Sequence, residues 1–253
     1  MDRFTKQLVY GTAYLAILAL LATGAYFAFF RSSAGCDNGR RDANEEGVDC
    51  GGACSLVCLP SDLRPIVVES ASVFTPLSNR VSALIKIKNP NANLAARNLP
   101  YTLNLMDAGR KVVRTISGTT FIYGGEIKYL AAYIDTAGLA KIAAVEAKLG
   151  NPEWAKLDNF RRPEIILQSR TTSADAVETR VAGRIANRDT VAFREAKVMA
   201  IFYGSTAGKS IGVSETTLDN LGAGEARDFA VIHPPIAGID STKTEVVIAA
   251  RRP

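Results

Sequence analysis

The sequence predicts an all-β protein made of two tandem immunoglobulin-like β-sandwiches, preceded by one N-terminal transmembrane helix and a small cysteine-rich loop segment. Three observations carry this prediction: a long uncharged apolar run, four closely spaced cysteines, and two similar copies of alternating strands and turns. The expected parts are a short tail at 1–7, the helix at 8–30, a cysteine-rich collar at 31–60, and sandwiches at 61–155 and 160–253.

The apolar run reads LVYGTAYLAILALLATGAYFAFF, 23 residues without a charge. About 20 helical residues suffice to cross the hydrocarbon core of a bilayer. A cleaved signal peptide is the competing interpretation, but its apolar region is usually about 7–15 residues long and ends in small residues, unlike AYFAFF. A lipoprotein with its lipid on Cys36 is a third option, although Ser33 stands where a large aliphatic residue is expected. We therefore predict an uncleaved membrane anchor.

The orientation of the anchor follows mainly from chain order. Arg3 and Lys6 precede the span and Arg31 follows it, so the charge bias toward a cytoplasmic N-terminus is small. A short segment lies before the span and most of the chain lies after it. We expect a single-pass protein of the cell membrane with a cytoplasmic N-terminus and an extracytoplasmic C-terminal region.

The cysteines all lie in the predicted collar, and an exported collar would face an oxidising space. Their even number predicts two disulfides among three possible pairings, between which the sequence does not choose. A zinc site is the alternative, but zinc pairs are usually spaced C-x2-C and the one histidine, His233, lies far away. The four residues are Cys36, Cys50, Cys54 and Cys58.

Oxygen-bearing side chains recur in the same loop at steps of four, three and four. Oxygen ligands in a short glycine-containing loop suit Ca²⁺, although this is not EF-hand spacing and Arg40 and Arg41 intervene. A solvated acidic loop held by disulfides is the alternative interpretation, with no cofactor. The calcium hypothesis rests on Asn38, Asp42, Glu45 and Asp49.

The collar also resembles a cysteine motif, C-x-[DN]-G-x-x-[DN]-x-x-E-x-G-V-D-C-G-G-x-C, that recurs in exported bacterial proteins beside β-sandwich modules. The resemblance implies a bacterial cell-envelope location. Asn38 stands where the motif favours Asp, which weakens the calcium interpretation. The matching residues are Cys36, Asn38, Gly39, Asp42, Glu45, Gly47, Val48, Asp49, Cys50, Gly51, Gly52 and Cys54.

After Pro60 the chain consists of two copies of one pattern. RVSALIKIKNPNA corresponds to TRVAGRIANRDT about 100 residues later, so that Asn89 and Asn187 fall at the same position. Gly125-Glu126 corresponds in the same way to Gly224-Glu225. A repeat of about 100 residues indicates a domain duplication rather than a solenoid. Six or seven short antiparallel strands per copy are typical of an immunoglobulin-like sandwich.

Alternation predicts the core residues, and the stretch at 151–163 is the expected linker. Trp154 in that linker would either dock the two modules together or belong to a core. Because of the linker prolines we expect a small interface between two independently folding modules. The predicted core residues are Ile85, Ile87, Leu103 and Leu105 in the first copy and Val181, Ile185, Val198 and Phe229 in the second.

The second copy resembles the FxLYD family of immunoglobulin-like modules. Its strand ends in an aromatic-Tyr pair, Phe202-Tyr203, and LGAGEARDFAV resembles the family's closing L-x-x-G-E segment at Leu221, Gly224 and Glu225. The first copy lacks the aromatic-Tyr pair and carries Leu105-Met106 there. The resemblance implies the fold and brings no catalytic residues.

The motifs and charges favour a binding role over catalysis. The chain has no G-x-S-x-G, P-loop, H-E-x-x-H or Rossmann pattern, and His233 before two prolines indicates a turn residue. The net charge of +5 is scattered, which argues against nucleic-acid binding. We therefore expect a non-enzymatic membrane protein that presents two sandwiches for protein binding or envelope assembly. The alternatives are a structural spacer or accessory subunit of a pilus or secretion machine, and a calcium-dependent adhesion module.

Overall fold

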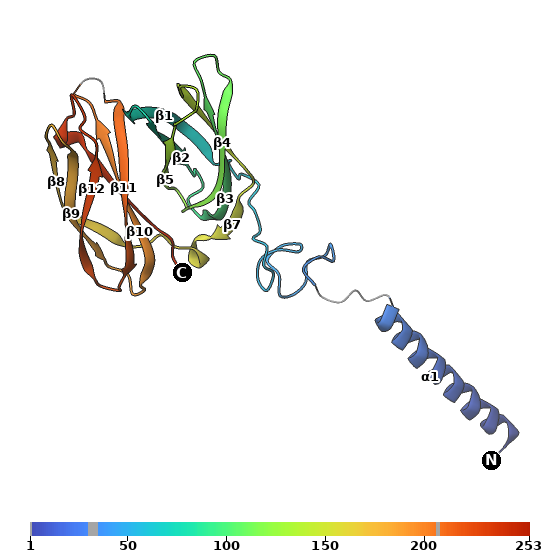
Figure 1. Ribbon diagram of the computed structural model, residues 1–253. Helices are drawn as coiled ribbons and strands as arrows, with labels where there is room; N and C mark the ends of the chain where they lie inside the picture. Colours follow the sequence, from blue (N-terminus) through green and yellow to red (C-terminus); the bar gives the residue numbers. More distant parts are fainter. Residues whose placement is uncertain (1, 30–34, 206–207) are drawn as a thin grey trace. The chain divides into compact units, whose positions relative to one another are not determined.

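The computed structural model describes residues 2–29, 35–205 and 208–253, which form two compact units, Met1–Ser61 and Asp62–Pro253 (Figure 1). The first unit holds the N-terminal helix and the collar, and the second holds both sandwiches. The predicted helix end at Phe30, and Arg31 and Ser33 of the collar, lie outside the described residues. The predicted all-β architecture with one N-terminal helix is confirmed.

The helix, α1, covers Arg3–Phe29 and therefore begins five residues before the uncharged run. Arg3 and Lys6 lie in its first turns, where they extend the helix beyond the apolar segment. The stretch Arg3–Phe27 is long and apolar enough to cross a membrane, and none of it is buried by the rest of the described chain. A helix of this kind serves as a membrane span or as a signal sequence.

The first sandwich consists of two antiparallel sheets. One has the strand order β1-β2-β5 and the other β4-β3-β6, with β7 also paired to β3. Strand β7 lies within the stretch 151–163 suggested as a linker, but it pairs with β3 and so belongs to the first sandwich, whose predicted end was residue 155. The strands are β1 (Val67–Leu77), β2 (Arg80–Lys88), β3 (Leu94–Met106), β4 (Val112–Ile122), β5 (Ile127–Asp135), β6 (Ala144–Leu149) and β7 (Glu153–Lys156), followed by the short 3-10 helix η1 (Leu157–Asn159).

The second sandwich repeats this topology. Its sheets have the orders β12-β9-β8 and β11-β10-β13, so β8 to β13 correspond one by one to β1 to β6. The duplication read from the sequence is therefore a duplication of strand connectivity. The elements are β8 (Ile165–Ala174), β9 (Thr179–Asn187), β10 (Phe193–Tyr203), β11 (Ser210–Leu221), β12 (Ala226–His233), the 3-10 helix η2 (Ser241–Lys243) and β13 (Glu245–Ala250).

Each sandwich has its own apolar core between its two sheets. Alternate residues of a strand point to opposite faces, which is why the period-two pattern identified the inward positions. All eight predicted core residues are buried: Ile85, Ile87, Leu103, Leu105, Val181, Ile185, Val198 and Phe229. Trp154 packs against the core of the first sandwich, which decides between the two roles considered for it.

A fully buried asparagine ties together three segments in each copy. In the first, Asn89 Nδ2 donates to the carbonyls of Leu94 (2.7 Å) and Tyr123 (3.0 Å), and its Oδ1 accepts from Asn91 N (3.0 Å). In the second, Asn187 makes the same three bonds to the corresponding parts of the chain. Its Nδ2 donates to Val191 O (2.8 Å) and Gly222 O (2.8 Å), and its Oδ1 accepts from Asp189 N (2.9 Å).

The Gly-Glu pairs complete this arrangement. Glu126 Oε2 accepts the N–H of Tyr123 at 2.7 Å, and Glu225 Oε2 accepts the N–H of Gly222 at the same distance. The preceding glycines, Gly125 and Gly224, have φ of 67° and 70°, a conformation that L side chains rarely adopt. The Gly-Glu motif therefore forms a turn, and the buried asparagine hydrogen-bonds to a carbonyl of that turn.

The two sandwiches touch through a third apolar cluster. Leu84 of β2 packs with Met199 and Ile201 of β10 and with Val213 of β11, and all four are buried. The outer face of sheet β1-β2-β5 thus meets the outer face of sheet β11-β10-β13, and β5 lies beside β11 at this junction (Figure 1). The expectation that the linker alone would keep the interface small did not anticipate this shared cluster.

The docking is asymmetric because different sheets of the two copies take part. Met199 and Ile201 correspond in the repeat to Thr102 and Asn104, which lie on the equivalent outer face of the first sandwich. There the polar side chains pair with neighbours on β4, and Asn104 Oδ1 accepts from Thr115 Oγ1 at 3.0 Å. The equivalent face of the first sandwich is thus polar, and only the second sandwich uses this face for apolar packing.

We predict that Asn187→Asp destabilises the second sandwich by about 3 kcal/mol or more. The carboxylate has no N–H to offer the carbonyls of Val191 and Gly222, and it is buried. Calorimetry of residues 62–253 measures the effect. Asn104→Asp is the matched control, since its side chain is at the surface and its Oδ1 still accepts from Thr115.

In the same experiment the first sandwich should keep its own transition, because it has a separate core. That transition should move to lower temperature, since Leu84 loses its apolar partners when the second sandwich unfolds. If Asn187→Asp abolishes one single transition as a whole, the two copies are one cooperative domain and the independence of the modules is wrong.

Candidate functional site

The collar is held by two disulfides, Cys36–Cys54 and Cys50–Cys58, which join residues 18 and 8 positions apart. No free cysteine is left among the described residues. The pairing selects one of the three connectivities that the sequence allowed. Because zinc is bound by thiolates, sulfurs paired in this way do not supply the zinc site that was the alternative.

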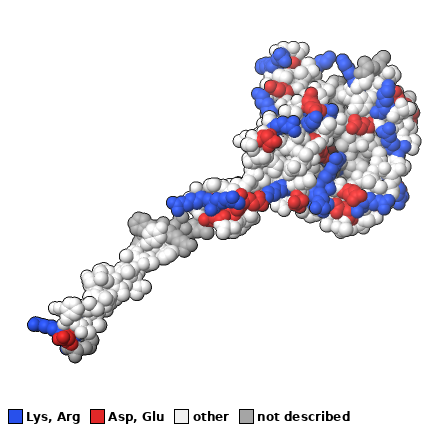
Figure 2. All heavy atoms as spheres, turned by 180° about the vertical axis from the view of Figure 1, so that it is seen from behind, with Lys and Arg blue, Asp and Glu red and all other residues white. Residues whose placement is uncertain are grey.

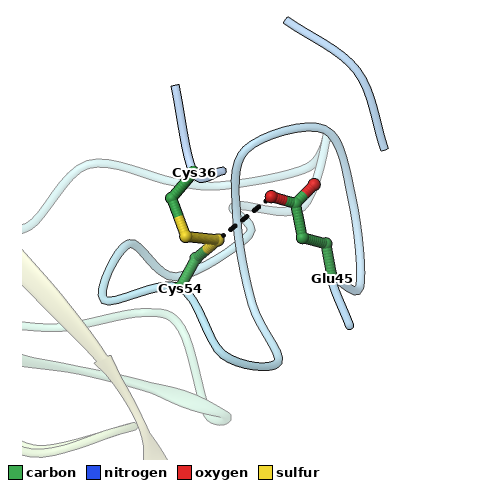
Figure 3. A group of neighbouring side chains, drawn as sticks. All are labelled: Cys36, Glu45 and Cys54. Atoms are coloured by element: carbon green, nitrogen blue, oxygen red, sulfur yellow. Dashed lines mark hydrogen bonds between the residues drawn. A yellow bond between two sulfur atoms is a disulfide. The ribbon is translucent and has the colours of Figure 1, made fainter. Parts of the chain in front are cut away.

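Glu45 lies at the centre of the collar and is buried, with 6% of its surface exposed. Its Oε2 accepts the backbone N–H groups of Asp42 (3.1 Å) and Asp49 (3.2 Å). Its Oε1 lies 3.2 Å from Cys54 Sγ (Figure 3). A disulfide sulfur carries no proton, so this last approach is a sulfur–oxygen contact.

Asp42 and Asp49 also point their carboxylates at backbone donors. Both oxygens of Asp49 accept N–H groups at 2.9 Å, one from Asn38 and one from Gly39. Asp42 Oδ2 accepts from Gly35 N (2.8 Å) and from Asn38 Nδ2 (2.9 Å). The four residues singled out for calcium thus lie close together, and their side chains hydrogen-bond within the described part of the loop.

The carboxylates of the loop are directed at the N–H groups of its own chain. Within residues 2–29, 35–205 and 208–253, one group of three Cys, His, Asp or Glu ligand atoms lies within 4.8 Å of one another, and it is Cys36, Glu45 and Cys54. Two of these atoms belong to a disulfide, whereas Ca²⁺ takes oxygen ligands. The geometry favours the structural use of these carboxylates, and the calcium hypothesis stays a prediction.

His233 is the last residue of β12 and is buried rather than in an open turn. Its ring lies edge-on to Phe202 at 5.2 Å, and its Nδ1 lies 2.7 Å from Pro234 O. Burial lowers the pKa of His233 below its usual value. The imidazole packs on a core phenylalanine, and its Nε2 is buried without a hydrogen-bond partner among the described residues.

A cleft of about 340 Å³ opens along the junction of the two sandwiches. Strands β4 and β5 of the first sandwich form one side, and β10 and β13 of the second form the other. Lys128 of β5 lines this cleft although it is 6% exposed, and its Nζ lies 3.5 Å from the ring centre of Phe121. Burial lowers the pKa of Lys128 to about 8, with Lys197 and Arg162 adding to the effect and Glu126 opposing it.

Charges of both signs are mixed on the face that Figure 2 presents, where Lys and Arg are interspersed with Asp and Glu. This mixture agrees with the scattered basic residues of the sequence and with a solvated surface.

Comparison with known proteins does not assign the chain to a family. No protein-family model matches the chain, and no curated protein matches it in sequence. Among solved structures, a transglutaminase from red sea bream is similar at 10% identity and a TM-score of 0.26, covering 74% of this chain and 31% of that chain. This chain thus spans less than a third of the length of that enzyme, and a likeness this distant carries no argument about function.

Sequence reasoning found the collar and missed the cleft. The available signal was the apolar pair Met199 and Ile201 on the outward positions of β10, where the first copy has polar residues. Lys128 gave a weaker signal, because it occupies an inward position of a strand that otherwise alternates regularly. Neither signal identifies the strands that form the opposite wall of the cleft.

We predict that Glu45→Gln loosens the collar, so that a thiol reductant opens the Cys36–Cys54 bond about tenfold faster. The amide is a weaker acceptor for the N–H groups of Asp42 and Asp49, and it removes the negative charge beside Cys54. Alkylation and mass spectrometry give the rate. Asp37→Asn is the control, since it removes the same charge from an exposed position; an equal acceleration in this variant would show that only net charge matters.

We predict that Lys128→Met raises the free energy of unfolding by on the order of 1–3 kcal/mol at pH 7. Folding depresses the pKa of Lys128, so the cost of burying its charge is complete below pH 8. Between pH 8 and the unfolded-state pKa of about 10.4 the unfolded chain binds more protons, so this cost fades as the pH rises.

Denaturant unfolding at pH 7 and pH 10 measures the effect, and the gain should shrink at the higher pH. Lys148→Met, at a side chain that is 64% exposed, should show no such change. A gain from Lys128→Met that is the same at both pH values would contradict burial of the charge as its cause.

Proposed function

We propose that this chain is a non-enzymatic single-pass membrane protein that presents two extracytoplasmic sandwiches to other proteins of the cell envelope. The N-terminus is cytoplasmic, α1 is the retained anchor, and the disulfide collar separates the anchor from FxLYD-like modules. The bacterial origin comes from the resemblance of the collar motif. The observation that carries the proposal is the combination of an uncovered apolar helix with disulfides on its C-terminal side.

The helix supports the proposal through the cost of leaving it in water. Its side chains are apolar around the whole circumference, and large ones such as Leu20, Leu21 and Tyr14 are exposed by 74%, 65% and 65%. A helix that is hydrophobic on all sides belongs in a core or in a membrane. Since the described chain does not cover it, the bilayer is the environment that fits it.

The collar supports the orientation. Disulfides persist in oxidising compartments and are rare in the cytosol of most organisms. Cys36–Cys54 and Cys50–Cys58 follow the helix directly in the chain, so an oxidising location for them places the following sandwiches on the same side of the membrane.

The sandwiches offer strand edges to a partner. Strands β8 and β12 are each hydrogen-bonded to β9 on one side and form the two edges of the outer sheet of the second sandwich. Such an edge can accept an added strand from another protein. The hairpin between β8 and β9 also exposes Val177 by 80%. A role as a spacer or accessory subunit of a pilus or secretion machine would use the same anchor without engaging these edges.

The topology is tested with cysteines introduced on either side of α1. In intact cells made permeable only at an outer envelope, an impermeant maleimide should label Val177→Cys and should not label Asp2→Cys. Labelling of Asp2→Cys should appear after lysis, which controls for reactivity. The reverse pattern, or a mature chain without α1, would overturn the proposed location.

The binding role is tested with a photo-crosslinking residue at Val177 in native membranes. A binding module gives discrete crosslinked partners, and the same probe at Lys148, on the first sandwich, serves as the comparison. A monomeric protein with no crosslink from either site would favour the spacer function.

A further inference from the structure

We propose that the cleft between the two sandwiches is a binding site for a small amphipathic carboxylate, whose charged group pairs with Lys128 and whose apolar body lies along β13. This inference goes beyond envelope-protein binding and does not depend on the membrane topology. It rests on the cleft, on the lack of a polar partner for the buried amine of Lys128 among the described residues, and on the pairing of the other charges around it.

The ammonium of Lys128 has no polar partner in the part of the chain that the structure describes. Its Nζ lies 3.5 Å from the ring centre of Phe121, and no hydrogen bond or ion pair within 4.0 Å joins it to a described residue. The residue is 6% exposed, so water does little to replace that partner. Buried charges in proteins are normally paired, so an uncommitted cation that lines a cleft is a position for an anion.

Other charges around the cleft are already engaged or lie at its mouth. Lys197 Nζ lies 3.6 Å from Glu195 and 3.9 Å from Glu215, so its charge is engaged by two carboxylates and is not free to pair with a ligand. Glu126 uses its Oε2 to accept the N–H of Tyr123. Arg251 is exposed and lies 6.0 Å from the ring of Phe121, on which Lys128 also rests.

The remaining lining is suited to an apolar body. Leu130 and Met199 contribute from opposite sandwiches, and Val247 and Ile248 come from β13. The volume of about 340 Å³ falls in the range of small-molecule sites, which are mostly apolar with a few polar groups that fix the orientation. A ligand with one carboxylate and a short apolar chain satisfies both parts, whereas a cationic ligand would leave Lys128 unpaired and add like charge beside it.

The probe is hexanoate, with hexanamide as its uncharged analogue, added to the full-length protein in an uncharged detergent. Saturation-transfer NMR or calorimetric titration should show saturable binding of hexanoate and binding of hexanamide that is about tenfold or more weaker. Lys128→Met should weaken hexanoate binding by a similar factor and leave hexanamide unchanged. Lys148→Met, an exposed lysine outside the cleft, should leave both unchanged.

A second readout uses the wild-type protein and needs no variant to fold. Hexanoate should slow the acetylation of Lys128 by acetic anhydride, followed by peptide mass spectrometry, and should not slow that of Lys148. The proposal is overturned if hexanoate shows no saturable binding, if hexanamide binds equally well, or if Lys128 is not protected in the wild-type protein.

Discussion

The buried amides of Asn89 and Asn187 are the contacts around which each sandwich is organised. Each side chain donates to carbonyls from two segments and accepts the backbone N–H of the residue two positions further along the chain. The amide thereby joins the connection after the second strand of each copy to the turn that precedes its fifth strand. A buried asparagine left without these partners would cost more than the bonds contribute, so the amide enforces one register for the connections.

Duplication of the sandwich explains why both copies have the same strand order, but not how one sandwich packs against the other. The copies have the same strand order, yet different sheets meet at the junction. The apolar Met199 and Ile201 allow one outer face of the second copy to pack against the first copy. The equivalent face of the first copy carries the polar Thr102 and Asn104 and remains exposed to solvent. As a result β5 of the first copy lies beside β11 of the second, and the cleft lined by Lys128 opens at this junction.

The collar shows a different way to build structure from few residues. Its described residues form one isolated bridge, between Gly47 and Cys50, and no longer ladder, so their backbone N–H groups need other acceptors. Glu45, Asp42 and Asp49 supply them, and the disulfides limit the unfolded alternatives of a segment too small for a core. The same carboxylates that suggested a calcium site from their spacing are explained by this need, because their oxygens are directed at the backbone.

The sequence by itself determined the strand faces, the position of the asparagine turns, the duplication and the apolar helix, because these depend on local periodicity and on residue types with few conformational options. Ile85 and Ile185 are buried where alternation placed them, and Gly125 and Gly224 occupy turns that only glycine adopts readily. The tertiary structure alone decided which cysteines pair, where the carboxylates of Asp42 and Asp49 point, and that Leu84 and Lys128 are buried. These outcomes depend on which surfaces far apart in the chain come into contact, and the energy of such contacts is not encoded in any local pattern.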